Sequence, residues 1–226
     1  DHLTSLEIIR VFSAVDVDPN FSVELRNVKS LTAPDMITAN VFPNLEHLDI
    51  PHYRNPEQTE LDRVSRLVLF SQLESLSLPV IGNEMLQAIA THTKLTELHV
   101  EFDRNTEYDF EALDRLTNLK ILALRADRNR NKLNQGALWQ TISLMTNLEA
   151  LDMFHINEKS VDILKKLPKL KQLQVVGKQA ASFDETQLQS LTNLQVLRLA
   201  SGYLFNHHQQ HQCKLNLPYL YHCSDY

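Results

Sequence analysis

The sequence predicts an α/β solenoid, with parallel strands along one face and helices along the other. The pattern L-x-x-L-x-L, which ends in Leu, Ile, Val or Met, begins at seven positions. Apolar stripes with helical spacing lie between successive copies. One strand and one helix cannot bury their apolar faces alone, so the copies are expected to stack around a continuous core. The copies begin at Leu45, Leu73, Leu95, Leu119, Leu148, Leu170 and Leu194.

The spacing of the copies follows a second, longer period. The intervals are 28, 22, 24, 29, 22 and 24 residues, so Leu73 and Leu148 lie 75 residues apart, as do the next two pairs. The helical stripes follow the same 75-residue period, since Leu86 and Val161 are apolar residues at equivalent positions. The short lead-in before each copy also recurs, most often as Thr-Asn-Leu. Random leucine abundance would not keep phase in both strand and helix.

Apolar stripes predict a helix in each of the first four intervals between copies. Within residues 83–91, Met85, Leu86 and Ile89 share one face of a helix. Trp139 belongs to such a stripe and is expected in the core on the helical side. The other stripes are Leu61, Val64 and Leu67; Phe110, Leu113 and Leu116; and Leu138, Trp139 and Ile142.

The two ends of the chain are expected to cap the core. Residues 1–44 fit either degenerate repeats, with frames that start at Leu3 and Leu25, or a capping helix over 2–14 followed by a strand at 21–25. Residues 201–226 are expected to form the other cap, with a tenth strand at 217–222. The whole chain, 1–226, is predicted to be one domain with regular repeats over 45–200.

The pattern resembles the leucine-rich-repeat superfamily over residues 45–200. That resemblance implies a horseshoe whose concave surface is a parallel sheet and whose convex surface carries helices. The repeat lengths and helical segments are similar to the ribonuclease-inhibitor and F-box-associated branches. The family's Asn or Cys nine residues into each repeat is mostly missing. The residues there are Tyr53, Ile81, Asp103, Asp127, Ile156, Lys178 and Gly202, so the repeats are irregular.

Composition restricts the class of partner. The 226 residues include 22 basic and 28 acidic side chains, a net charge of −6, which argues against nucleic acid as the partner. There is no apolar run of about 20 residues and no signal peptide, so no membrane contact is expected. Extracellular leucine-rich repeats commonly carry paired-cysteine caps, and no such N-terminal cap is present. We therefore expect a monomeric, cytoplasmic protein.

The sequence offers little for catalysis or metal binding. His207 and His211 are four residues apart, a spacing that suits zinc or copper on a helix, and Cys213 could join them. The cluster lacks a tight C-x-x-C pair, so a polar terminal face is favoured over a metal site. Cys223 lies beside His222, and neighbours in sequence generally point apart. With 4 glycines there is no phosphate loop, and we predict no catalytic residue, no metal and no cofactor.

The concave sheet is the predicted functional surface. Positions three, five and seven of each copy point away from the core, by the two-residue alternation of a strand. This gives an acidic and histidine-rich middle, with two phenylalanines as possible anchors, and suits a protein partner that bears basic and apolar groups. Other outward residues are Ser75, Ser77, Ile121, Ala123, Gln172 and Gln174. The predicted partner-binding residues are His47, Asp49, Glu97, His99, Glu101, Phe102, Arg125, Asp152, Phe154, His155 and Arg198.

The leading hypothesis is a non-enzymatic module that binds a protein on its concave sheet. The resemblance also suggests a eukaryote-like effector that intracellular bacteria secrete, which would act in the host cytosol. The alternative is the substrate-recognition part of a ubiquitin ligase whose catalytic or adaptor segment lies elsewhere. A metal-binding role ranks third.

Overall fold

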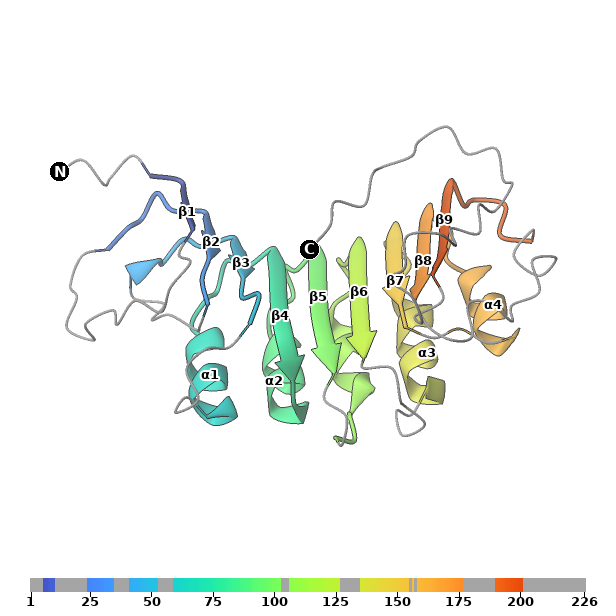
Figure 1. Ribbon diagram of the computed structural model, residues 1–226, viewed down its shortest axis with the longest axis horizontal. Helices are drawn as coiled ribbons and strands as arrows, with labels where there is room; N and C mark the ends of the chain where they lie inside the picture. The colour runs from blue at the N-terminus through green and yellow to red at the C-terminus, as the bar shows by residue number, and fades with distance from the viewer. Residues whose placement is uncertain are drawn as a thin grey trace.

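A computed structural model shows a single row of parallel strands with helices on one side (Figure 1). It describes residues 6–10, 24–34, 41–52, 59–102, 106–126, 135–154, 156, 158–176 and 190–200.

Over these residues the sheet has nine strands in the order of the sequence, each parallel to the next. In β5 the residues alternate strictly, with Leu98, Val100 and Phe102 buried and the residues between them half-exposed. The predicted leucine-rich-repeat solenoid is therefore confirmed. The strands are β1 Ile8–Arg10, β2 Ser30–Thr32, β3 His47–Asp49, β4 Ser75–Ile81, β5 Glu97–Phe102, β6 Ile121–Ala126, β7 Ala150–Met153, β8 Gln172–Val176 and β9 Val196–Ala200.

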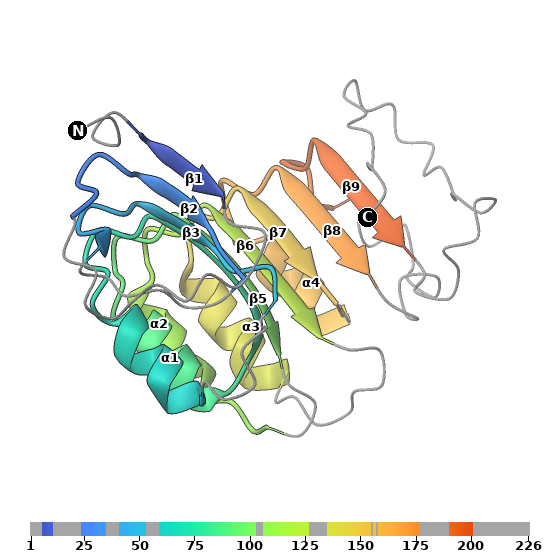
Figure 2. The ribbon, with the colours of Figure 1, turned by 60° about the vertical axis from the view of Figure 1, so that its left-hand side comes forward.

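The helices cover one side of the sheet and leave the other side open (Figure 2). They are α1 Glu60–Leu67, α2 Asn83–Ile89, the 3-10 helix η3 Phe110–Arg115, α3 Gln135–Leu144 and α4 Glu158–Leu164. Each packs against the next along the row. None of the helices in the described part of the chain is long and apolar enough to cross a membrane.

Most of the predicted helical stripes are buried. Met85, Leu86 and Ile89 lie in the core, and Trp139 is 4% exposed on the helical side, as predicted. Leu61 is the exception, because it is 71% exposed. Three-residue steps fall short of a 3.6-residue turn, so Leu61 lies about 120° around α1 from the buried Leu67. The spacing identified the helix but misplaced this side chain.

Two strands near the N-terminus, β1 and β2, extend the sheet beyond the seven regular repeats. Ser30 pairs with Ile8 and with His47, so the repeat frames begin at Leu6 and Val28. The strand alternative therefore describes this region, although its predicted frames began three residues too early. A helix over 2–14 is wrong, since β1 occupies residues 8–10.

The lead-in residue before each copy ties neighbouring repeats together. In four repeats an Asn side-chain nitrogen donates to a backbone carbonyl of the preceding repeat. In two repeats the residue at this position is Lys, and its amino group donates to the side-chain amide oxygen of the lead-in residue in the preceding repeat. The bonds are Asn44 to Arg26 (3.0 Å), Asn118 to Thr93 (2.9 Å), Asn147 to Thr117 (2.9 Å), Asn193 to Pro168 (3.3 Å), Lys94 to Gln72 (2.6 Å) and Lys169 to Asn147 (2.6 Å).

Candidate functional site

The open face of the sheet, opposite the helices, corresponds to the predicted concave surface. Its residues form columns, because the strands pair in register about 4.8 Å apart. Two columns run through all nine described strands. The first column contains Ile8, Ser30, His47, Ser75, Glu97, Ile121, Ala150, Gln172 and Val196. The second column contains Arg10, Thr32, Asp49, Ser77, His99, Ala123, Asp152, Gln174 and Arg198.

The structure brings most of the predicted binding residues onto this open face. His47 and Glu97 share the first column, and Asp49, His99, Asp152 and Arg198 share the second. Glu101 and Arg125 are paired residues in β5 and β6, one step further along the strands. His155 lies outside the described residues, as do His207, His211 and Cys213.

Phe102 does not belong to the site, contrary to the prediction. It is 1% exposed and packs with Tyr108 and Phe110, at ring-centroid distances of 4.7 and 5.4 Å. The hydroxyl of Tyr108 donates to the carbonyl of Ile81 at 2.6 Å, which fixes this aromatic cluster beneath the sheet. Phe102 occupies an even position of its strand, and this directs it into the core. Phe154 is half-buried and packs against the core.

Asp152 contacts two polar side chains of neighbouring strands on the open face. Its Oδ2 lies 3.8 Å from Arg125 Nη2, and it accepts a hydrogen bond of 3.2 Å from Gln174 Nε2. Ala123 lies between Asp152 and His99 in the second column and is only 4% exposed. An alanine on an open face is covered only if its neighbours close over it. The polar side chains therefore gather around a small central residue.

Burial alters both titratable groups beside Ala123. It raises the pKa of Asp152 above the ordinary 3.8, although Arg125 and His99 act in the opposite direction. It lowers the pKa of His99 below 6.5, against the attraction of the Glu97 carboxylate. At neutral pH the face therefore presents a neutral imidazole beside a carboxylate. The neutral ring can both donate and accept a hydrogen bond.

Three other carboxylates on β3 and β5 are available to a partner. Asp49, Glu97 and Glu101 are half-buried and form no ion pair with any described residue. Glu97 accepts one hydrogen bond, of 3.2 Å, from Ser75 Oγ. Carboxylates that are partly desolvated and lack a cation gain more from an incoming Lys or Arg than fully solvated ones do.

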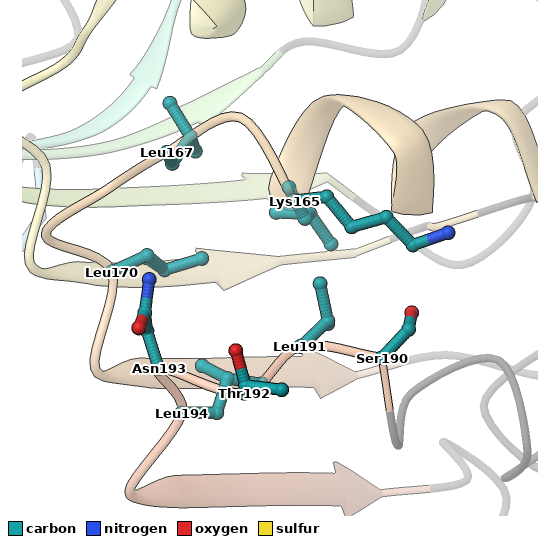
Figure 3. Close-up of a pocket in the computed structure, with 9 residues that line it drawn as sticks. Lys165, Leu167, Leu170, Ser190, Leu191, Thr192, Asn193 and Leu194 are labelled. Carbon is teal, nitrogen blue, oxygen red and sulfur yellow. The ribbon is translucent and has the colours of Figure 1, made fainter.

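The described residues offer no alternative metal or ligand centre of comparable quality. They contain no group of three His, Cys, Asp or Glu side chains placed to hold a metal ion. A hollow beside the last two strands is lined by Leu170, Leu191 and Asn193, with Lys165 at its rim (Figure 3). Its cavity volume of about 30 Å³ suits one or two water molecules, whereas ligand pockets are about tenfold larger.

Two residues in the group around Asp152 were not predicted as binding residues. Alternation alone placed Ala123 and Gln174 on the open face, but their roles depend on neighbouring strands. Gln174 orients the carboxylate of Asp152, and Ala123 leaves room for the side chains around it. Neither role can be predicted from the sequence of a single repeat, because each depends on a side chain from a neighbouring strand.

Comparison with known proteins adds solved structures of low similarity. No family model matches the chain, and no curated protein matches it. An internalin from Listeria monocytogenes is 15% identical with a TM-score of 0.48, over 78% of this chain and 55% of that one. Internalin C2 of the same organism is 19% identical with a TM-score of 0.47, over 78% and 73%. A leucine-rich-repeat protein from Leptospira interrogans is 16% identical with a TM-score of 0.45, over 78% and 50%.

The chain spans about half the length of the first and third of these proteins. Its class is defined by its own features, namely the in-phase repeats, the parallel sheet in sequence order and the helices on one side. It is a leucine-rich-repeat solenoid.

Proposed function

We propose that the chain is a non-enzymatic module that binds a protein partner on the open face of its sheet. The observation that supports this most directly is the arrangement around β5. Glu97, His99 and Glu101 project from one strand and are half-buried, and the two glutamates form no ion pair with any described residue. An unfilled set of charged and hydrogen-bonding groups on a rigid sheet is suited to recognition.

Apolar residues beside the acids indicate what the partner would present. Ile121 pairs with Glu97 across one strand and with Ala150 across the other, and all three are half-buried. A partner with an aliphatic or aromatic side chain next to a Lys or Arg would satisfy both kinds of group. A few buried anchors, most often Trp, Tyr or Arg, dominate the energetics of protein interfaces.

The charge distribution favours one orientation of that partner. Residues 1–114 contain 20 acidic and 8 basic side chains, whereas residues 115–226 contain 8 acidic and 14 basic. The net charges are therefore −12 and +6. We expect the cationic part of the partner to lie over β3 to β5 and any acidic part to lie towards Arg125 and Arg198.

The proposed setting is the cytosol, which would be that of a host cell if the protein is a secreted effector. The alternative is the recognition part of a ubiquitin ligase, which would use the same face. We propose a monomer that needs no cofactor and contacts neither nucleic acid nor membrane. Co-purification of ligase subunits that persists when the open face is altered would favour the alternative.

The test is affinity capture from eukaryotic lysate with matched charge-reversal variants. Glu97→Lys with Glu101→Lys alters the open face without breaking an ion pair between described residues. Glu84→Lys with Glu111→Lys makes the same change of charge on the helical side, where both residues are exposed. Circular dichroism should show that all chains are folded. We expect a specific partner to lose about tenfold or more in affinity with the first variant only. Equal capture by both variants would reject the open face as the site.

A further inference from the structure

One buried column of the solenoid contains a histidine where the other repeats have apolar residues. The residue three positions before the first leucine of each L-x-x-L-x-L copy points inward, between the helix and the strand. Each of these residues is buried, and in six of the seven repeats it is Phe, Leu or Met. The column consists of Phe42, Phe70, His92, Leu116, Met145, Leu167 and Leu191.

His92 is enclosed in the interface between two repeats. Its side chain is 6% exposed, and the backbones of Phe70 and Leu67 in the preceding repeat hydrogen-bond to the ring. Its Nε2 has no hydrogen-bond partner among the described residues. A buried polar atom without a partner is costly, and a buried charge there would be costlier still.

No charged group among the described residues is a cause of the shift in the pKa of His92. The segments packed around it carry charges of both signs, with Arg66 on α1, Lys94 on its own turn, and Asp114 and Arg115 on η3. Lys94 is directed to Gln72 Oε1 at 2.6 Å. Burial is the largest cause that lowers the pKa of His92 below 6.5, and the two backbone hydrogen bonds act in the opposite direction. The folded state therefore favours the neutral ring.

The turn that holds His92 leads directly into β5. The amide of His92 donates to Ile89 at 3.0 Å, and its carbonyl accepts from Leu95 at 3.0 Å. The next repeat is attached here too, through Asn118 Nδ2 and the carbonyl of Thr93. Movement of this ring would disturb residues 90–96 and the start of β5 together.

We propose that His92 is an acid-sensitive joint of the solenoid, at which uptake of a proton expels the ring and opens the turn at residues 90–96. The open state has its ring in water, where the ordinary pKa of 6.5 applies. Opening is then favoured as the pH falls below 6.5, until the pKa of the closed state is reached. The open face at β5 would loosen with it. This inference concerns the fold and does not depend on the proposed partner.

The test is amide hydrogen exchange of residues 93–98 at about pH 7.5 and about pH 5.5, corrected for the intrinsic pH dependence of exchange. In the unaltered chain we expect the opening constant to rise, by at most about tenfold for an open-state pKa of 6.5. His92→Leu places in the column a residue that three other repeats have, and it should abolish the rise. His99→Gln, on the open face of β5, removes the contribution of a second histidine whose pKa is lowered by burial and should leave the part of the rise that His92 causes.

A second measurement covers the case in which His92→Leu does not fold. The His92 ring can be titrated by NMR in the unaltered chain, assigned through its own Cβ–Cδ2 correlation. A pKa below 6.5 supports the joint, whereas a pKa at or above 6.5 overturns it. An equal pH response of the unaltered chain and folded His92→Leu would also overturn it.

Discussion

At the scale of single residues, the open face depends on what surrounds Ala123. A larger residue there would push His99 and Asp152 apart, since the two flank it in the second column. The enclosure has a cost, because it raises the pKa of Asp152. A carboxylate that is kept where its charged form is disfavoured is more typical of a functional position than of a purely structural one.

The cost at Asp152 can be measured through its pH dependence. An acid whose pKa is raised by folding destabilises the folded state above that pKa, and the penalty vanishes below the unfolded value of 3.8. We therefore expect Asp152→Asn to increase the urea midpoint at neutral pH, with an advantage that shrinks as the pH falls towards 4. Asp162→Asn, at an exposed carboxylate beside Lys165, is the control and should change little. A loss of stability in Asp152→Asn would show that the contact with Arg125 outweighs burial.

At the scale of elements, side chains of one helix cap the N-terminus of the next helix. Glu60 at the start of α1 accepts hydrogen bonds from the amides of Gly82 (2.9 Å) and Met85 (3.1 Å) at the start of α2. Gly82 provides no side-chain cap of its own, so the carboxylate from the preceding repeat takes that role. One repeat onward, Asn83 Oδ1 accepts from the amide of Asp109 at 2.9 Å.

A double-mutant cycle can test this capping between helices. A Cβ on Gly82 would collide with the Glu60 carboxyl group, so Gly82→Ala should displace the cap. We expect Glu60→Ala and Gly82→Ala each to cost about 1 kcal/mol in the free energy of unfolding. The double variant should cost less than the sum, because both changes remove the same contact. Glu60→Gln keeps an acceptor and should cost less than Glu60→Ala. Additive costs would show that the two residues act independently.

At the scale of the whole molecule, one continuous core holds together a chain with oppositely charged halves. The buried leucines of the described strands form a single cluster from β2 to β8. The halves carry net charges of −12 and +6. The described strands of the two halves, β1 to β5 and β6 to β9, lie towards opposite ends of the row (Figure 1), so attraction between these parts acts mainly near the middle. Repulsion within the acidic half acts over its full length.

This charge distribution predicts how stability depends on salt. The Debye length is about 30 Å at 0.01 M salt and about 8 Å at 0.15 M, so added salt screens the repulsion within the acidic half. We expect the urea midpoint to rise as NaCl is raised from about 0.01 M to about 0.15 M. Replacing two exposed acids of that half, with Glu84→Gln and Glu111→Gln, should reduce the rise. A midpoint that falls with salt would mean that attractive pairs dominate.

The regular repeats were predictable because their signals are local. The alternation along β5 and the stripe of α2 each follow from a few neighbouring residues. Where the local signal was weaker, the prediction failed in specific ways. Leu61 fitted a three-residue spacing that drifts around the helix. Phe102 was predicted as a binding residue, but it is the final residue of β5 and turns into the core. The frames at Leu6 and Val28 became clear only from strand pairing.

The sequence by itself determined the class of fold, the phase of its seven regular repeats and the residues that alternation directs to the open face. Those properties follow from periods of 2 and 3.6 residues, which each segment expresses alone. Tertiary structure alone decided the burial of Ala123, the raised pKa of Asp152, the cap that Glu60 places on α2 and the enclosure of His92. Each of these depends on contacts between repeats, and a pattern within one repeat does not encode the shape of its neighbour.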